Sequence, residues 1–255
     1  MSKWEVQLLR RWELVCDGAP VPIGGFRRRL VAGVTLAGPA SFEAVAQLLL
    51  PGRAPEDSME RLRAEVSRVQ HGMPGLLDDS EELLALAPEV GVDLTELLRA
   101  ADGPNAIVHA APELIGELRD AELLPGWAEG WTLHYRELVR LFRLATLEAI
   151  ARCSLQFDDA ATAAAAARSS AAIAPLRESS HALLIRALIL GGNLHEAFYV
   201  HEDFRHRLLK QTGAEPSPAL TGALGLATET YGGGGRRRPL TAATHASGAT
   251  TEGGS

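Results

Sequence analysis

Cysteines, aromatic residues and long apolar runs are all scarce in this 255-residue sequence. Its two cysteines, Cys16 and Cys153, lie far apart and match no metal-ligand or disulfide spacing, so we expect two reduced, buried thiols. No apolar run approaches the roughly 20 residues that a membrane-spanning helix needs. The first residues are interrupted by charge and lack the apolar region of a signal peptide. These absences predict a cytoplasmic protein that does not act in a membrane.

Aromatic residues amount to 5% of the chain, whereas apolar residues reach 46% with many alanines and leucines, which favours helices over strands. The net charge of −7 is unevenly distributed. Residues 1–77 carry 10 basic and 8 acidic side chains, residues 78–130 carry 2 and 13, and residues 131–255 carry 13 and 11. The acidity is concentrated in the middle segment and the N-terminal part is neutral to basic, so the net charge argues only weakly against nucleic-acid binding.

The sequence also lacks the residue spacings that carry catalysis or bind metals. His201 and His206 are five residues apart, which separates them by about 140° around a helix, so they do not share a face as a metal-binding pair does. The run GGGGRRR near the C-terminus has no strand before it and no helix after it, unlike a phosphate-binding loop. Asp158 and Asp159 stand at an expected helix start, where they interact favourably with the helix dipole. We therefore expect a protein that is not an enzyme and uses no metal or cofactor.

In the N-terminal part, the spacing of apolar residues predicts strands first, then helices, then a hairpin. Asp17-Gly18 is a turn signal between β-rich runs, and Ser41 is a plausible N-cap of a helix. Asp57 or Ser58 is expected to cap the next helix. The expected elements are short strands over 4–23, helices over 26–37, 42–50 and 59–72, and a hairpin with an acidic turn over 76–87. This order predicts a winged helix-turn-helix.

The third of these helices has two distinct faces. At 100° per residue, the core face is expected to hold Met59, Leu62, Val66 and Val69. The opposite strip holds small and polar residues with basic side chains at its margins: Glu60, Ala64, Ser67 and His71, flanked by Arg61, Arg63 and Arg68. A DNA recognition helix has this layout, because short groups reach base edges and long basic chains reach phosphates or guanine. An ordinary solvated helix face is the alternative interpretation, and it applies equally to the run Arg27-Arg28-Arg29, which could contact phosphate.

The rest of the chain is predicted to be helical. A short helix at 93–101 precedes a linker punctuated by Pro and Gly, in which Trp127 and Trp131 are interpreted as packing anchors between segments, with an aromatic ligand site as the alternative. A long helix begins at Thr132, and an alanine-rich helix follows the motif FDDA at 157–160.

Residues 174–218 hold two further helical runs joined by the turn Gly191-Gly192-Asn193. The first run is apolar almost all round and must be covered on more than one side, while the second has one apolar stripe. LHEA at 194–197 matches FDDA at 157–160, 37 residues earlier, close to the roughly 34-residue period of tetratricopeptide helix pairs. An imperfect helical repeat is predicted, followed from residue 232 by a tail of disordered composition.

Several of these segments resemble one bacterial family. WAEGW at 127–131, APLRESSHALLIRAL from residue 174 and GNLHEAFYVHEDFRHRLLKQTGAEPSPAL up to residue 220 are similar to the bacterial transcriptional activator domain of the Streptomyces antibiotic regulatory protein (SARP) family. A weaker similarity covers the N-terminal part, through Asp17-Gly18, VSR at 66–68 and VDL at 92–94.

The resemblance implies a mainly α fold with a small β component, a winged helix-turn-helix followed by a tetratricopeptide-like all-α domain. The expected limits are a winged domain at 1–93, a helical and acidic linker at 94–130, an activator domain at 131–231 and a tail at 232–255. It also implies a transcriptional activator of a biosynthetic gene cluster, such as one for an antibiotic. Its partners would be double-stranded promoter DNA with direct repeats, RNA polymerase holoenzyme and a second copy in a homodimer. The DNA contacts implied by position are Arg61, Arg63, Ser67, Arg68 and His71, with Arg27, Arg28 and Arg29 added from the basic run.

The chain departs from the family pattern in and around the third helix. Glu65 precedes VSR where the family has an aromatic residue or His, and Gln70 stands where the family has a basic residue. The hairpin carries four carboxylates, which would repel DNA phosphates: Asp78, Asp79, Glu81 and Glu82. The alternative function is therefore a helical-repeat protein that binds a partner or a ligand and whose winged domain has lost DNA binding.

Overall fold

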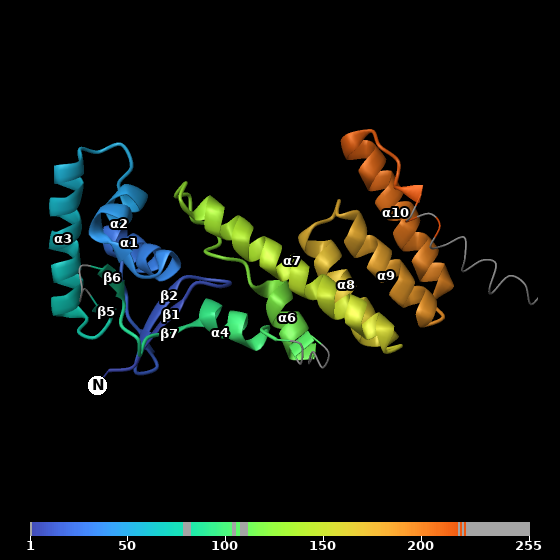
Figure 1. Cartoon of the computed structure of the whole chain (residues 1–255), viewed down its shortest axis with the longest axis horizontal. Coiled ribbons are helices and arrows are strands. Elements are labelled where there is room, and N and C mark those ends of the chain that lie inside the picture. Colours follow the sequence, from blue (N-terminus) through green and yellow to red (C-terminus); the bar gives the residue numbers. More distant parts are fainter. Residues whose placement is uncertain are drawn as a thin grey trace, which may run out of the picture.

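The computed structural model describes residues 2–78, 83–103, 106–107, 112–218, 220 and 222. A small α/β part at the N-terminus adjoins a stack of helices (Figure 1). This arrangement confirms the predicted fold class at the level of a winged helix followed by a helical domain.

Four short strands form the N-terminal sheet. They are β1 (Trp4–Gln7), β2 (Glu13–Cys16), β3 (Ala19–Pro20) and β7 (Gly91–Val92), in the order β3-β2-β1-β7. β1 is antiparallel to β2 and parallel to β7. Between β2 and β3 the backbone has φ 50° at Asp17 and 80° at Gly18, and this pair of left-handed residues matches the twist of a tight hairpin. The expected strands and their turn are confirmed.

Three helices follow this sheet: α1 (Gly25–Ala37), α2 (Phe42–Leu49) and α3 (Pro55–Gly72). The predicted N-cap of α2 is confirmed, because the Ser41 hydroxyl accepts a hydrogen bond from the Ala44 N–H at 3.2 Å. The predicted cap of α3 is wrong. That helix begins at Pro55 with no side-chain cap, so Asp57 and Ser58 lie inside its first turn. Proline starts a helix well because its φ is already helical and the N–H it lacks would have no partner there.

The wing is a three-stranded sheet made of β4 (Ala40–Ser41), β6 (Leu83–Leu86) and β5 (Leu77–Asp78), in that order. β5 and β6 are antiparallel, with Leu77 opposite Leu86, which confirms the predicted hairpin. The tip of the hairpin, residues 79–82, lies outside the described residues.

The core of the N-terminal part is closed by the inner face of α3. Leu62, Val66 and Val69 are buried, and Met59 is half-buried against the same cluster. The predicted phase of this helix is therefore confirmed. Because α3 cannot rotate without exposing these side chains, its outer face is held in one orientation.

Asp93 attaches the next helix to the N-terminal sheet. Its carboxylate accepts hydrogen bonds from the backbone N–H groups of Leu8, Leu9 and Leu94, at 2.7 to 3.1 Å. Burial raises the pKa of Asp93, and these three donors oppose that effect because they stabilise the charged form. α4 (Asp93–Ala100) is thereby oriented by the end of β1.

The helical part begins with α6 (Pro112–Asp120), which lies within the segment predicted to be a linker, 94–130. It packs against α7 (Thr132–Gln156) and α8 (Ala160–Ile173). α9 (Glu178–Leu190) then packs on α7, α8 and α10 (Leu194–Thr212), as expected for a helix that is apolar on nearly all sides (Figure 1). The predicted starts of the long helix at Thr132 and of the last helix at residue 194 are confirmed.

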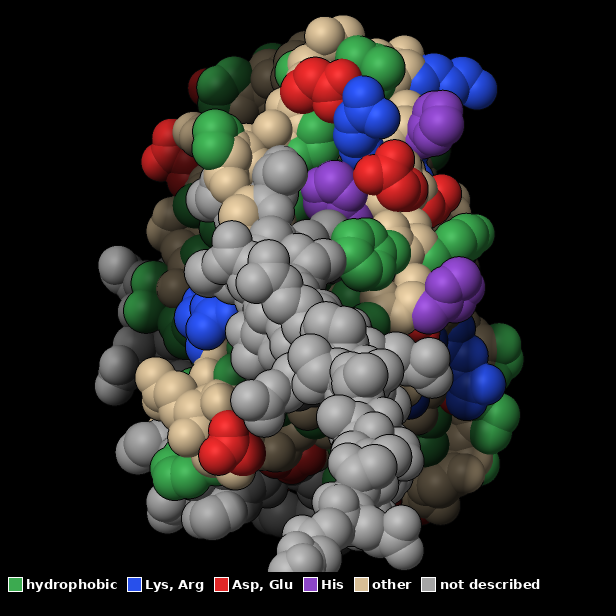
Figure 2. Space-filling model, turned by 90° about the vertical axis from the view of Figure 1, so that its right-hand side faces the viewer, with side chains coloured by type: hydrophobic (Ala, Val, Ile, Leu, Met, Phe, Trp, Pro, Cys, Tyr) green, Lys and Arg blue, Asp and Glu red, His purple; other side chains and the backbone are tan. Residues whose placement is uncertain are grey.

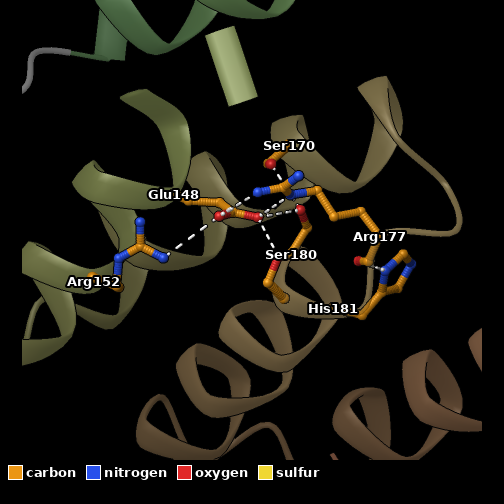
Figure 3. A network of polar contacts seen from close by, with 7 residues as sticks. Glu148, Arg152, Ser170, Arg177, Ser180 and His181 are labelled. Atoms are coloured by element: carbon orange, nitrogen blue, oxygen red, sulfur yellow. Dashed lines mark hydrogen bonds and ion pairs between the residues drawn. The ribbon is translucent and has the colours of Figure 1, made fainter. Parts of the chain in front are cut away.

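A buried carboxylate ties α7 to the start of α9 (Figure 3). Glu148 is 4% exposed and accepts hydrogen bonds from Arg177 Nε at 2.7 Å, Ser179 Oγ at 2.6 Å and Ser180 Oγ at 3.0 Å. Arg152 lies 3.5 Å away on the same helix. The network satisfies a charge that would otherwise be very unfavourable in the core.

Among the described residues, no helix combines the length and the apolar character that crossing a membrane would require.

Candidate nucleic-acid interface

The outer face of α3 carries all five side chains of this helix that are predicted to contact DNA. Each of them is exposed: Arg61, Arg63, Ser67, Arg68 and His71. In Figure 1, α3 forms the outer edge of the N-terminal part, away from the helical stack. The structure therefore brings these residues together on one accessible surface.

Glu65, a departure from the family pattern, connects α3 with α1. One oxygen of its carboxylate lies 2.6 Å from Arg68 Nη1 and the other lies 3.3 Å from Arg27 Nε. The Glu65 side chain is mostly buried, whereas both guanidinium groups are about half exposed. One carboxylate thus holds two arginines at the same edge of the exposed face and leaves a net positive charge there.

The ring of Phe26 at the start of α1 positions two more arginines. The guanidinium carbons of Arg61 and Arg29 lie 5.0 and 5.4 Å from the ring centroid. A cation near an aromatic face is attracted by about 0.5–1 kcal/mol at an exposed site. These contacts restrict the side chains without neutralising their charge.

Arg28 points away from this surface. Its guanidinium carbon lies 4.3 Å from the ring centroid of Trp127, and its Nε is buried without a hydrogen-bond partner. The run Arg27-Arg28-Arg29 is therefore divided among three surroundings, and Arg28 would have to leave Trp127 to reach a phosphate. The sequence alone does not distinguish the three arginines, because Trp127, the partner of Arg28, is far away along the chain.

Aromatic rings join the two parts of the molecule at this point. Trp127, 7% exposed, lies 5.6 Å from Trp12 and 6.2 Å from Trp131, and Trp131 lies 6.4 Å from Tyr135, all edge-on between ring centroids. Trp12 belongs to the N-terminal sheet region and Tyr135 to α7. The prediction that Trp127 and Trp131 are packing anchors between segments is confirmed.

The wing lies beside α3, which contacts β5. Asp78, the one wing carboxylate within the described residues, is half-buried at the end of β5. Asp79, Glu81 and Glu82 lie outside the described residues, so their effect on DNA binding stays a prediction.

The histidines of α10 do not form a ligand cluster. His195 and His206 are exposed, while His201 is buried with its Nδ1 3.1 Å from Glu202. Figure 2 shows histidines and side chains of both charges mixed along the visible part of this end of the molecule. Within the described ranges, no three His, Cys, Asp or Glu residues are grouped so that they could hold a metal ion.

Comparison with known proteins assigns the second part of the chain. A family model described as "Bacterial transcriptional activator domain" matches residues 112–224, from the first turn of α6 to beyond α10. Residues 112–224 therefore form a domain of this family. The resemblance to the SARP family, found first in the residues around Trp127 and between α8 and α10, is confirmed.

A solved structure has a similar fold over most of this chain. It is Mycobacterium tuberculosis EmbR in complex with a low-affinity phosphopeptide, with a TM-score of 0.61 and 20% sequence identity over 91% of this chain and 70% of that chain. EmbR too has a winged helix followed by a helical domain. No curated protein matched the sequence significantly. The domain match and the shared fold support a transcriptional activator of the SARP type.

Proposed function

We propose that this activator binds promoter DNA sequence-specifically by placing α3 in the major groove. It would bind direct repeats as a side-by-side pair or a homodimer and would recruit RNA polymerase holoenzyme to a biosynthetic gene cluster. The observation that carries the proposal is the single exposed face of α3, on which Arg61, Arg63 and Arg68 surround the short Ser67.

The geometry of this face suits the major groove. A helix fits the groove only if its middle strip is short, so that the backbone can approach the base edges. Ala64 and Ser67 supply short side chains there, and the arginines at the margins are long enough to reach guanine or phosphate. The pairing of Arg27 and Arg68 with Glu65 holds both cations beside the strip before DNA arrives.

The test is a comparison of affinities at several salt concentrations. Fluorescence anisotropy should measure binding of the full chain to a labelled duplex from its own upstream region and to a scrambled duplex of equal composition. We expect tighter binding of the native duplex by about a thousandfold or more, retained at physiological salt. Affinity that ignores the sequence and disappears at moderate salt would show that α3 makes only nonspecific phosphate contacts.

The acidic hairpin motivates a second function, an interaction protein whose winged domain no longer binds DNA. If the wing repels DNA, replacing Asp78 and Asp79 by asparagine should raise the affinity for the native duplex, because two negative charges near phosphate are removed. The second function requires instead that the chain retain RNA polymerase in a pull-down without DNA and bind neither duplex, with or without these substitutions.

A further inference from the structure

Three arginines follow one face of α7. Arg136, Arg140 and Arg143 are separated by four and then three residues, the spacing of neighbours on a helix surface. With Arg10 and Arg119, they line a cleft of about 800 Å³. A volume of this size suits a small organic molecule.

Two of these arginines point their donors at backbone carbonyls instead of carboxylates. Arg143, 8% exposed, donates from Nε to the Leu118 carbonyl at 2.6 Å and from Nη2 to the Arg119 carbonyl. Arg136 donates to the carbonyls of Leu123, Leu124 and Trp127. Neither arginine has an ion pair within the described part of the chain. Carbonyl dipoles orient a guanidinium but do not cancel its charge, which stays positive at any physiological pH.

The carboxylates near the cleft are too few to balance it. Asp120 pairs with Arg119 at 2.7 Å, Glu122 is the second acidic residue of the wall, and Glu137 pairs with Arg140 from outside the wall at 2.8 Å. Five guanidinium groups thus face three carboxylates. The remaining wall is partly apolar, with Leu123, Val139 and Ile173.

Both parts of the chain contribute to the cleft. Arg10 lies between β1 and β2, and its backbone N–H donates to the Glu122 carbonyl at 2.8 Å. Its φ of 66° is unusual for a residue other than glycine, and the contact with residue 122 helps to hold it. α3 lies at the far edge of the N-terminal part (Figure 1), so the cleft is separate from the proposed DNA surface.

We propose that this cleft binds a small organic anion: a carboxylate, sulfonate or phosphate attached to an apolar body. The guanidinium groups of the exposed Arg10 and the half-buried Arg140 would hold the anionic group through charge-assisted hydrogen bonds. The aliphatic wall would cover the apolar body. Arg136 and Arg143, already held by carbonyls, supply a fixed positive field.

The test uses two fluorescent probes of nearly the same shape. 8-Anilinonaphthalene-1-sulfonate carries the anionic group, and N-phenyl-1-naphthylamine has the same aromatic skeleton without it. Titration of the full chain should show binding of the sulfonate, with the uncharged probe at least tenfold weaker. The double variant Arg10→Gln/Arg140→Gln should weaken sulfonate binding at least tenfold and leave the uncharged probe unchanged.

The matched control is Arg168→Gln/Arg186→Gln, which removes two exposed arginines on α8 and α9 outside the cleft. It should bind the sulfonate as the native chain does. Circular dichroism melting checks that both double variants fold. If the cleft double variant does not fold, the single variants Arg10→Gln and Arg140→Gln are tested in its place.

Three outcomes would overturn the proposal. Equal binding of both probes would show that the protein selects apolar surface and not charge. Equal loss in the cleft variant and the control would place the sulfonate elsewhere. Displacement of the sulfonate by a duplex of unrelated sequence would make the cleft part of a DNA-contacting surface. None of these results tests whether α3 binds promoter DNA sequence-specifically. The proposal for the cleft and the proposal for α3 can therefore fail independently.

Discussion

At the scale of single residues, Glu148 combines deep burial with full charge. Burial raises its pKa, but the hydrogen bonds from Arg177, Ser179 and Ser180 outweigh burial and lower the pKa to about 2. A folded-state pKa below the ordinary value of 4.5 means that the unfolded chain takes up a proton first as the pH falls. The interaction therefore stabilises the fold fully above about pH 4.5 and is lost as the pH falls toward 2.

Replacing Glu148 by glutamine should remove this pH dependence. A shift of this size corresponds to about 3 kcal/mol of unfolding free energy, and we expect a loss of roughly that size at pH 7 because Arg177 loses its partner. Urea denaturation followed by circular dichroism between pH 7 and pH 3 measures both effects. Glu137→Gln, which breaks the exposed pair with Arg140 on the same helix, is the control and should change little. A variant as acid-sensitive as the native chain would contradict the assignment.

Arg68 is the residue on α3 that the proposed DNA contact depends on most directly. Arg68→Ala should weaken binding to the native duplex by ten- to a hundredfold, since one good arginine contact to a base contributes about 1–3 kcal/mol. Arg168→Ala, an equally exposed arginine on α8, is the matched control and should leave the affinity unchanged. If the two substitutions behave alike in an anisotropy titration, Arg68 does not contact the bases.

At the scale of elements, α9 and α10 are joined by a buried histidine. The ring of His181 lies 4.2 Å from that of Phe204, and its Nδ1 lies 3.0 Å from the Arg177 carbonyl. Burial lowers the pKa of His181, although the carbonyl opposes this, and Arg207 on α10 lowers it further. The unfolded chain therefore binds a proton near pH 6.5 while the folded chain stays neutral at this site.

The contact of α9 with α10 should accordingly weaken as the pH falls below about 6.5. His181→Leu should remove this part of the pH dependence while keeping an apolar side chain against Phe204. Thermal melting at pH 7.5, 6.5 and 5.5 detects the difference between the native chain and the variant. His195→Leu, at an exposed position at the start of α10, should melt with the native pH profile. Identical profiles for the native chain and His181→Leu would refute the role of His181.

At the scale of the whole molecule, the junction between the winged part and the activator domain consists of packed rings and one cation. Trp127 contacts Trp12 on one side and Trp131 on the other, and Arg28 covers its face. Because Trp12 and Arg28 belong to the N-terminal part, this cluster sets how α3 is presented relative to the helical stack.

Arg27 and Arg28 should therefore behave differently although they are adjacent. Arg27→Gln should reduce the slope of log affinity against log salt by about one, as expected for one lost phosphate contact. Arg28→Gln should leave that slope unchanged and lower the melting temperature, because it removes the cation from Trp127. A reduced slope in Arg28→Gln would mean that this side chain leaves the junction to contact DNA.

Most of the elements could be predicted because their causes are local. Ser41 caps α2 and Asp159 caps α8 through hydrogen bonds three residues along the chain. The apolar spacing of Leu62, Val66 and Val69 predicts the inner face of α3 and hence its outer face. The start of α3 at Pro55 could also have been predicted from the sequence, since proline in a first helical turn is a local signal.

The arrangement of charged side chains could not be predicted in the same way. The spacing of Arg136, Arg140 and Arg143 on the predicted helix is visible in the sequence, but not that they face Arg10 across a cleft. In the sequence Glu65 is only a departure from the family pattern, and the structure alone shows that its carboxylate pairs with both Arg27 and Arg68. An arginine can reach many partners, and which one it meets depends on which surfaces pack.

By itself, the sequence determined the order of strands and helices, the faces of α3 and the family of the second domain, because caps, turns and periodicity act within a few residues. Only the tertiary structure decided which charges are paired and which remain free. Arg28 lies on Trp127, Glu148 holds Arg177, and the cleft arginines keep an excess of positive charge. These outcomes join residues far apart in the chain, and the burial and distance that set their energies exist only once the helices have packed.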